Sequence, residues 1–155
     1  MTLYFAYGSN MDATQISTRC QNAEFRAIGY LPDYELWFPR RSRARNCGVS
    51  SIRPALGSET WGVIFRLTDA DVAALDKSEG FVQGRDPRLN AYNRVDIQVM
   101  MGGAIVTAAT YIAEEQTNPP LPSTSYLSLL QSGAKKFELP DAYQVLLGKI
   151  VGEGP

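Results

Sequence analysis

Residues 3–11 read Leu-Tyr-Phe-Ala-Tyr-Gly-Ser-Asn-Met, a buried-strand pattern that runs directly into loop-forming residues. The first five residues are apolar or aromatic, which favours a strand. A glycine directly after a buried strand lets the backbone turn sharply and approach a ligand closely, and successive N–H groups in such a turn can bind an anion. Residues 8–10 are therefore a candidate binding loop, although an ordinary turn would use the same residue types. The stretch matches neither a phosphate loop nor a dinucleotide fingerprint.

Residues 75–80, Leu-Asp-Lys-Ser-Glu-Gly, form the second informative stretch and end a predicted helix. Thr68 is the predicted N-cap and Gly80 the terminator. Glu79 then lies at the negative end of the helix dipole, which disfavours its ionisation. If the side chain also faces an apolar cavity, desolvation raises its pKa further, as a general acid–base catalyst needs. The competing interpretation is an exposed glutamate at a helix end.

The rest of the chain alternates between strand and helix patterns. We expect strands over residues 24–31, 34–38, 48–53 and 60–67, separated by a Pro32-Asp33 turn, a basic loop over 39–47 and a turn over 55–58. Residues 92–101 and 104–113 predict a hairpin with a two-glycine turn. Helices are expected over residues 12–19, from Ser123 to about Gly133, and over 141–149. This order predicts one domain, residues 1–155, with an α+β fold or a small barrel with flanking helices.

Composition removes several reaction classes. The 155 residues contain no histidine and two cysteines, so neither a Ser-His-Asp triad nor a Cys-His dyad can form, and zinc lacks its usual ligands. Fifteen basic residues nearly balance sixteen acidic ones, which predicts no nucleic-acid partner. No signal-peptide pattern or bilayer-length apolar run is present, and two scattered thiols suit a reducing compartment. We therefore expect a cytoplasmic protein without a membrane partner.

The two stretches together resemble the γ-glutamylcyclotransferase family. Further blocks match in the family's order: residues 60–65 (Thr-Trp-Gly-Val-Ile-Phe), 109–112 (Ala-Thr-Tyr-Ile), 122–126, 133–135 and 139–143. Tyr-Gly-Ser-Asn alone is a weak pattern, but the ordered blocks cover nearly the whole chain and are specific.

The resemblance implies a small mixed β-barrel with flanking helices, and an enzyme that needs no cofactor and no metal. Family members convert γ-glutamyl amino acids to 5-oxoproline and a free amino acid, and the substrate's own α-amine is the nucleophile. Glu79 would be the acid–base, and N–H groups of residues 8–10 would stabilise the oxyanion. The implied partner is a small γ-glutamyl substrate, a homodimer is compatible with the resemblance, and the substrate-binding residues would be Tyr4, Phe5, Ala6, Tyr7, Gly8, Ser9, Asn10, Tyr92, Tyr111 and Tyr126.

Two segments depart from the family pattern. Residues 80–91 are longer than in the animal enzymes and carry Arg85, Asp86 and Arg88, which suggests a lid over the site. Residues 40–45 read Arg-Arg-Ser-Arg-Ala-Arg, either a solvated loop or a source of one arginine for a substrate carboxylate.

Alternatives to a γ-glutamyl amino acid are a γ-glutamylamine and a biosynthetic γ-glutamyl-protected compound. Intact glutathione fits less well, because the loop over residues 7–11 differs from that of the glutathione-specific branch. A non-catalytic small-molecule-binding relative and a structural interaction domain are the non-enzymatic alternatives.

Overall fold

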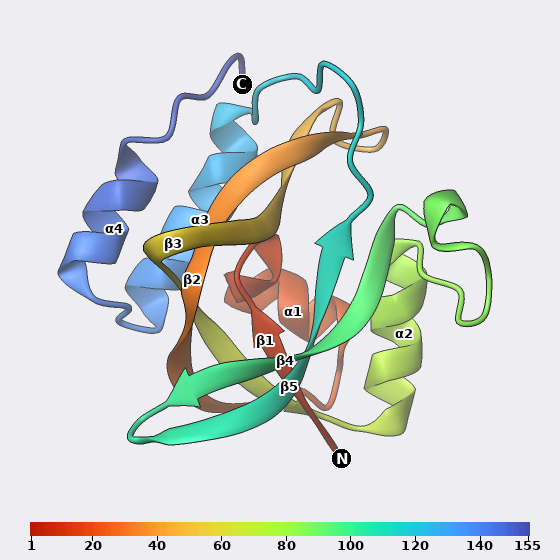
Figure 1. The fold of residues 1–155 in the computed structure, drawn as a ribbon, viewed down its shortest axis with the longest axis vertical. Helices are drawn as coiled ribbons and strands as arrows, with labels where there is room; N and C mark the ends of the chain where they lie inside the picture. Colours follow the sequence, from red (N-terminus) through yellow and green to blue (C-terminus); the bar gives the residue numbers. More distant parts are fainter.

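The computed structural model describes residues 1–155, and its strands close into a five-stranded barrel (Figure 1). The order around the barrel is β1-β3-β2-β4-β5. Neighbouring strands are antiparallel except β1 and β5, which pair in parallel at Tyr4 and Ala109 and so close the barrel. The predicted mixed barrel with flanking helices is therefore confirmed. The strands are β1 (Thr2–Ala6), β2 (Glu24–Ser42), β3 (Cys47–Leu67), β4 (Tyr92–Met101) and β5 (Ala104–Ala113).

The prediction of four short strands between residues 24 and 67 was wrong, because β2 and β3 form one long hairpin. The two predicted turns lie opposite each other within it: Pro32 pairs with Glu59 and Tyr34 with Pro54, so residues 55–58 stand opposite Asp33 alone. Asp33 has a φ of 60° and accepts a hydrogen bond from the Gly57 N–H at 2.9 Å. The turn residues therefore make a bulge that bends the hairpin without ending either strand.

The basic loop predicted for residues 39–47 is also mostly strand. β2 continues to Ser42 and β3 begins at Cys47, which leaves only residues 43–46 as the turn. The predicted β4–β5 hairpin is confirmed at the predicted residues, and Gly102 has the positive φ (61°) that its tight turn requires.

Local capping signals place the helices that reach the site. Asp12 caps α1 (Ala13–Arg19) by accepting from the Gln15 N–H. Thr68 and Asp71 form a reciprocal capping box at the start of α2 (Asp69–Glu79), and Gly80 ends that helix in the left-handed conformation with φ 71°. The predicted helix starts at Asp12 and Thr68 and the predicted helix end at Gly80 are therefore confirmed.

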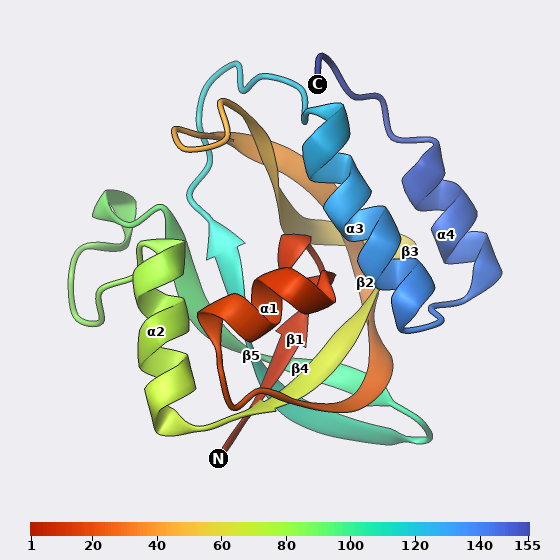
Figure 2. The same cartoon turned by 180° about the vertical axis from the view of Figure 1, so that it is seen from behind.

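Gly133, where the sequence predicts an end or a weak point of the helix, lies within α3 (Thr124–Lys136). A Cβ atom at this position would lie 2.5 Å from the backbone of Met11, so glycine allows α3 to pack against the short 3₁₀ helix η1 (Ser9–Met11). The last helix, α4 (Asp141–Gly148), follows Pro140 as predicted and packs beside α3. Figure 2 shows α1 in front of the barrel, between α2 and α3.

Two buried clusters hold the fold together. Eighteen buried residues, drawn from the helices and one face of the strands, form the larger cluster, and seven residues of the strands and their immediate ends form the smaller. Successive side chains of a strand point to opposite faces, so Tyr4 and Ala6 join the first cluster while Phe5 and Tyr7 join the second. None of the helices combines the length and hydropathy needed to cross a bilayer.

Candidate active site

Two connected cavities meet at Glu79. The inner one has a volume of about 40 Å³, and the outer cleft has a volume of about 440 Å³. Ser9, Glu79, Tyr92 and Tyr126 line both, so the inner cavity and the cleft adjoin at these four residues. The other residues that line the inner cavity are Tyr4, Tyr7, Gly8, Asn10, Ser50 and Tyr111.

The structure therefore brings nine of the eleven predicted site residues to one cavity. Phe5 and Ala6 are the exceptions. The Phe5 side chain is fully buried in the smaller cluster, and its carbonyl accepts from the Thr110 hydroxyl at 2.8 Å. Ala6 packs in the larger cluster. The side chains of both residues therefore pack in the core and do not line the cavity.

The backbone at residues 8–10 presents a row of free donors. Gly8 precedes η1, and the N–H groups of Gly8, Ser9 and Asn10 donate to no acceptor in the turns, loops and caps of the chain. A Cβ atom at Gly8 would lie 2.4 Å from the Ser50 hydroxyl, so glycine lets this loop approach β3. Successive free N–H groups of this kind can bind an anion, and these three residues line the inner cavity.

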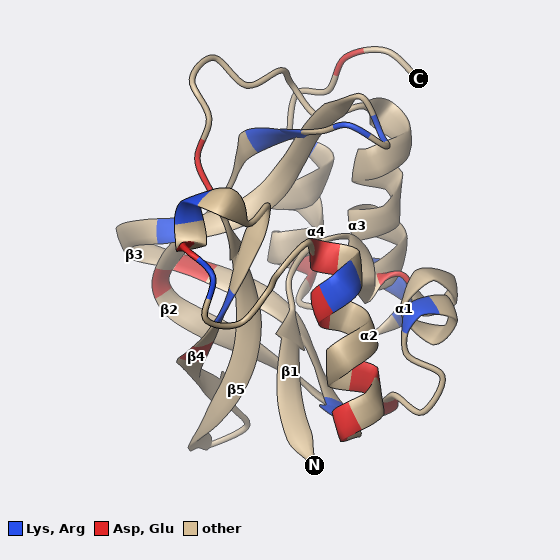
Figure 3. Ribbon diagram, turned by 90° about the vertical axis from the view of Figure 1, so that its right-hand side faces the viewer, with Lys and Arg blue, Asp and Glu red and all other residues tan.

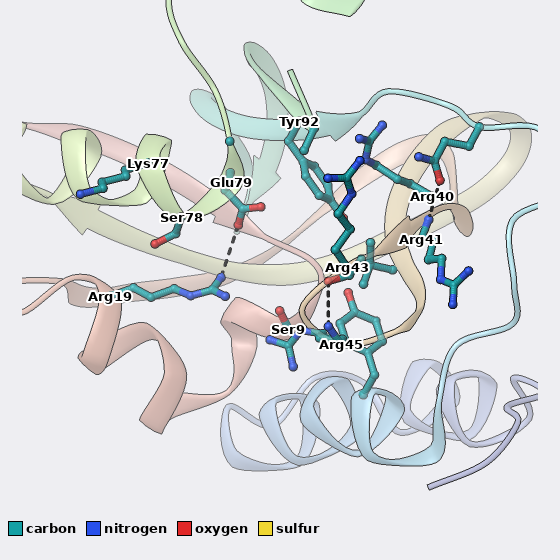
Figure 4. Close-up of a pocket in the computed structure, with 16 residues that line it drawn as sticks. Ser9, Arg19, Arg40, Arg41, Arg43, Arg45, Lys77, Ser78, Glu79 and Tyr92 are labelled. Atoms are coloured by element: carbon teal, nitrogen blue, oxygen red, sulfur yellow. Dashed lines mark hydrogen bonds and ion pairs between the residues drawn. The ribbon is translucent and has the colours of Figure 1, made fainter. Parts of the chain in front are cut away.

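Glu79 is the last residue of α2, and its side chain is only 14% exposed. The Asn10 amide donates to Glu79 Oε1 at 3.0 Å, and Arg19 Nη1 lies 3.6 Å from the same oxygen. Burial raises the pKa of the Glu79 carboxyl, and Arg19, Asn10 and Arg45 oppose that rise without cancelling it. Figure 4 shows the Arg19 guanidinium directed at this carboxyl.

Two side chains of helix α1 hydrogen-bond to Asn10. Gln15 Nε2 and Arg19 Nη1 donate to Asn10 Oδ1 at 2.9 and 3.0 Å, which leaves the Asn10 amide nitrogen to donate to Glu79 and to the Tyr4 hydroxyl, the latter at 2.9 Å. Sequence reasoning missed Gln15 and Arg19. Their spacing of four residues puts them on one helical face, but nothing local shows that this face meets Asn10.

The tyrosines of the inner cavity are held by hydrogen bonds. The Tyr92 hydroxyl donates to the Ser50 carbonyl at 2.6 Å, and the Tyr126 hydroxyl accepts from the Ser50 N–H at 3.0 Å. The Tyr7 hydroxyl donates to the Tyr111 carbonyl. Burial raises the pKa of Tyr4, Tyr7, Tyr92, Tyr111 and Tyr126, so all five hydroxyls are neutral at physiological pH. They act as uncharged hydrogen-bonding groups, and Ser50, which no sequence motif marked, positions two of them.

The ion pair between Asp76 and Arg94 positions Tyr111. Its hydroxyl donates to Asp76 Oδ1 at 2.6 Å, while Arg94 Nη1 lies 2.7 Å from Asp76 Oδ2. Asp76 of α2 is thus fixed between β4 and the cavity tyrosine.

The arginines of the long loop over residues 80–91 do not line the cleft. Arg85 Nε donates to Asn90 Oδ1 at 2.7 Å, and Arg88 pairs with Asp86 at 2.7 Å. Only the ends of the loop, Gly80 and Ala91, reach the cleft. The lid assigned to this segment stays a prediction.

Basic side chains dominate the outer cleft. They come from the tip of the β2–β3 hairpin, coloured blue in Figure 3, and from α1 and α2. Glu79 is the one acidic residue among the lining residues, and the basic ones are Arg19, Arg40, Arg41, Arg43, Arg45 and Lys77. Nowhere in the chain do three or more His, Cys, Asp or Glu side chains gather in a metal-binding arrangement.

Comparison with known proteins places this geometry in a family. The sequence pattern of the AIG2-like family matches residues 59–147. The chain is 32% identical over 153 residues to the γ-glutamylcyclotransferase of Mus musculus and 31% identical to that of Homo sapiens. Both alignments cover 96% of this chain and 78% of the relative.

Solved structures share the fold of this chain. A γ-glutamyl cyclotransferase structure superposes with a TM-score of 0.88 at 28% identity, covering 98% of this chain and 89% of that one. YkqA of Bacillus subtilis shares the fold, with a TM-score of 0.75 at 19% identity over 98% of this chain and 56% of its own.

Proposed function

The chain belongs to the AIG2-like family and to the γ-glutamylcyclotransferases, and from this premise we propose that it cyclises γ-glutamyl compounds with Glu79 as the acid–base. The observation that carries the proposal is the largely buried Glu79 side chain, which lines one cavity together with Gly8, Ser9 and Asn10, whose N–H groups donate to no acceptor in the turns, loops and caps of the chain. An acid–base catalyst and an anion-binding loop are the two elements that an intramolecular acyl transfer needs.

The reaction forms one bond and breaks one. The α-amine of the γ-glutamyl group attacks its own γ-carbonyl carbon, which makes the five-membered ring of 5-oxoproline, and the bond from that carbon to the leaving nitrogen breaks. Glu79 as a carboxylate accepts a proton from the α-ammonium group and, once protonated, delivers it to the leaving nitrogen. No enzymic nucleophile is required, which suits a chain that contains no histidine to activate one.

The raised pKa of Glu79 serves both halves of this proton transfer. A carboxylate with an ordinary pKa is a weak base toward an ammonium group, and desolvation makes the ionised form more basic. Arg19 and Asn10 favour the ionised form of Glu79 and so oppose this rise in its pKa. Asn10 also orients Glu79 Oε1 through its amide.

The tetrahedral intermediate carries its negative charge on the former γ-carbonyl oxygen. We assign this oxygen to the N–H groups of residues 8–10. One well-aimed donor of this kind lowers the barrier by roughly 3–4 kcal/mol in other enzymes. The neutral tyrosine hydroxyls would shape the inner cavity around the ring-forming geometry, which offsets the entropy of folding the glutamyl arm.

A γ-glutamyl compound is the proposed small-molecule partner, and neither nucleic acid nor membrane is part of the proposal. We place the protein in the cytoplasm, in keeping with its two free and buried cysteines. A homodimer stays a proposal that gel filtration with light scattering would test.

Mass-spectrometric detection of 5-oxoproline tests the reaction. Wild type and Glu79→Gln would be incubated with a panel of γ-glutamyl amino acids and γ-glutamylamines. We expect product from wild type and a decrease in turnover of roughly 10²–10⁴ in the variant, because Gln keeps the shape but carries no titrating proton. Undiminished turnover in the variant would refute the role of Glu79. An absence of product across the panel, together with tight binding of 5-oxoproline, would favour the non-catalytic binding relative.

A further inference from the structure

The outer cleft carries more positive charge than the proposed chemistry requires. Six basic side chains and one carboxylate line it. The chain forms four ion pairs, and Arg19 is the one cleft cation among them. Five cations of the cleft therefore have no carboxylate within ion-pair distance in the protein.

Two of these cations are half-buried and held by neutral acceptors. Arg40 Nη1 donates to the Glu114 carbonyl at 3.2 Å, and Arg45 Nη2 donates to Gln15 Oε1 at 2.5 Å. The Arg45 guanidinium also lies 5.2 Å from the centre of the Tyr126 ring. A partly desolvated guanidinium without a direct ion-pair partner is costly unless an anion joins it, so the cleft favours the binding of acid groups.

The exposed cations differ in direction. In Figure 4, Arg43 extends from the hairpin turn toward Tyr92, whereas Lys77 extends away from it. Arg41 is bound to Asn46 at 3.1 Å. The cations best placed for a ligand are therefore Arg40, Arg43 and Arg45, all from the tip of the β2–β3 hairpin.

The position of Glu79 decides which part of the substrate meets these arginines. The inner cavity, about 40 Å³, is too small to hold more than part of the glutamyl group, whereas the outer cleft measures about 440 Å³. Glu79 lines both cavities and, in the proposed reaction, protonates the leaving nitrogen at their junction. The leaving half of the substrate therefore extends into the outer cleft.

We propose that the hairpin arginines form a subsite for the leaving group, and that the preferred substrates are γ-glutamyl compounds whose leaving amine carries two or more acid groups. A simple γ-glutamyl amino acid has two carboxylates and one ammonium group, which leaves most of the cleft cations without a counter-charge. A leaving amine with a second carboxylate or a phosphate supplies a further counter-charge for the cleft cations. Planar guanidinium groups can bind a carboxylate or a phosphate through paired hydrogen bonds. This inference rests on the proposed function, because it assigns the substrate class of the same site.

Matched substrate pairs test the subsite. We would measure kcat/KM for γ-glutamylglutamate against γ-glutamylglutamine, and for γ-glutamylphosphoserine against γ-glutamylserine. We expect the acidic member to be preferred by at least about tenfold, with the preference decreasing as ionic strength rises. The pair with the larger ratio identifies carboxylate or phosphate as the better match.

Variants assign the preference to the hairpin. Arg40→Gln combined with Arg43→Gln should lower the ratio of acidic to neutral kcat/KM by about tenfold. Arg26→Gln, which removes an exposed arginine from β2 outside the cleft, should leave it unchanged. Equal losses for both members of a pair would mean that these arginines bind only the carboxylate common to all γ-glutamyl compounds, and would overturn the inference.

The outcomes separate this inference from the proposed function. Turnover of neutral and acidic substrates at equal rates would support cyclisation and refute the acidic preference. Calorimetric titration of Glu79→Gln with γ-glutamylglutamate and γ-glutamylglutamine measures the discrimination without turnover. Equal affinities there would also refute the subsite, whereas tighter binding of the acidic ligand would support it even if no product formed.

Discussion

Replacing Glu79 by Gln should make the protein less active and, at neutral pH, more stable. The Glu79 side chain is 14% exposed, and burial is the largest influence on the pKa of its carboxyl, which stays raised although Arg19, Asn10 and Arg45 favour the ionised form. The ionised carboxylate is therefore less favourable in the folded protein than in the unfolded chain. Gln has the same shape and no charge to desolvate, so the variant escapes that cost.

The pH window follows from the direction of the shift. A carboxyl with a raised folded-state pKa binds its proton more tightly when folded, so its stabilising contribution is complete below the ordinary value of 4.5 and is lost as pH rises through the folded-state pKa. Each unit of pKa difference corresponds to about 1.4 kcal/mol of unfolding free energy at higher pH. In a domain of this length, 1 kcal/mol moves the midpoint of thermal unfolding by roughly 2–4 °C.

Thermal unfolding between pH 4 and pH 8 measures the effect, alongside turnover of the preferred substrate. Glu59→Gln is the matched control, because Glu59 is exposed and forms no ion pair. We expect Glu79→Gln to melt above wild type at neutral pH and to converge with it toward pH 4. A variant less stable than wild type at neutral pH, or a difference independent of pH, would show that the ion pair with Arg19 outweighs desolvation and would refute the reasoning.

Three further outcomes follow from contacts around the site. Gly133→Ala should destabilise the protein by about 1–3 kcal/mol in urea unfolding, because its Cβ would lie 2.5 Å from the Met11 backbone. The control Gly148→Ala should leave the stability unchanged, because its Cβ meets nothing within 4 Å. Equal effects of the two substitutions would refute the close-packing argument. Asp76→Asn should lower kcat/KM, and it should lower the unfolding free energy by about 1–3 kcal/mol, because Arg94 and Tyr111 both lose a charged partner. An inactive variant of unchanged stability would contradict a positioning role for Asp76. Burial raises the pKa of the Cys20 thiol to about 11, so iodoacetamide at pH 8 should label Cys20 in denaturant and spare it in the folded protein, as peptide mass spectrometry would show.

Features encoded by a few neighbouring residues could be predicted from the sequence. Thr68 and Asp71 need only three residues of chain to close their capping box, and Gly102-Gly103 needs only its own backbone freedom to close the β4–β5 hairpin. The loop over residues 8–10 and the helix-end Glu79 were recognised in the same way, as short motifs of a known family. The barrel topology followed from that resemblance.

Features that depend on distant partners could not be predicted in this way. Pro32 and Asp33 have the composition of a turn, and only their pairing with residues 54–59 makes them a bulge inside a continuous strand. Gly133 has the composition of a helix terminator, and the approach of Met11 explains why the helix needs it and continues.

The sequence by itself determined the family, the barrel with flanking helices and the identity of the candidate acid–base. Only the tertiary structure decided the surroundings of that carboxyl: Asn10 held by Gln15 and Arg19, and Ser50 bonded to two tyrosines. The tertiary structure also shows that Phe5 and Ala6 do not line the cavity, and that arginines of residues 40–45 line the outer cleft. The physical reason is range: a cap or a turn is closed by neighbours in the chain, whereas a side chain's desolvation, and with it the pKa of Glu79, depends on groups up to 69 residues away along the chain.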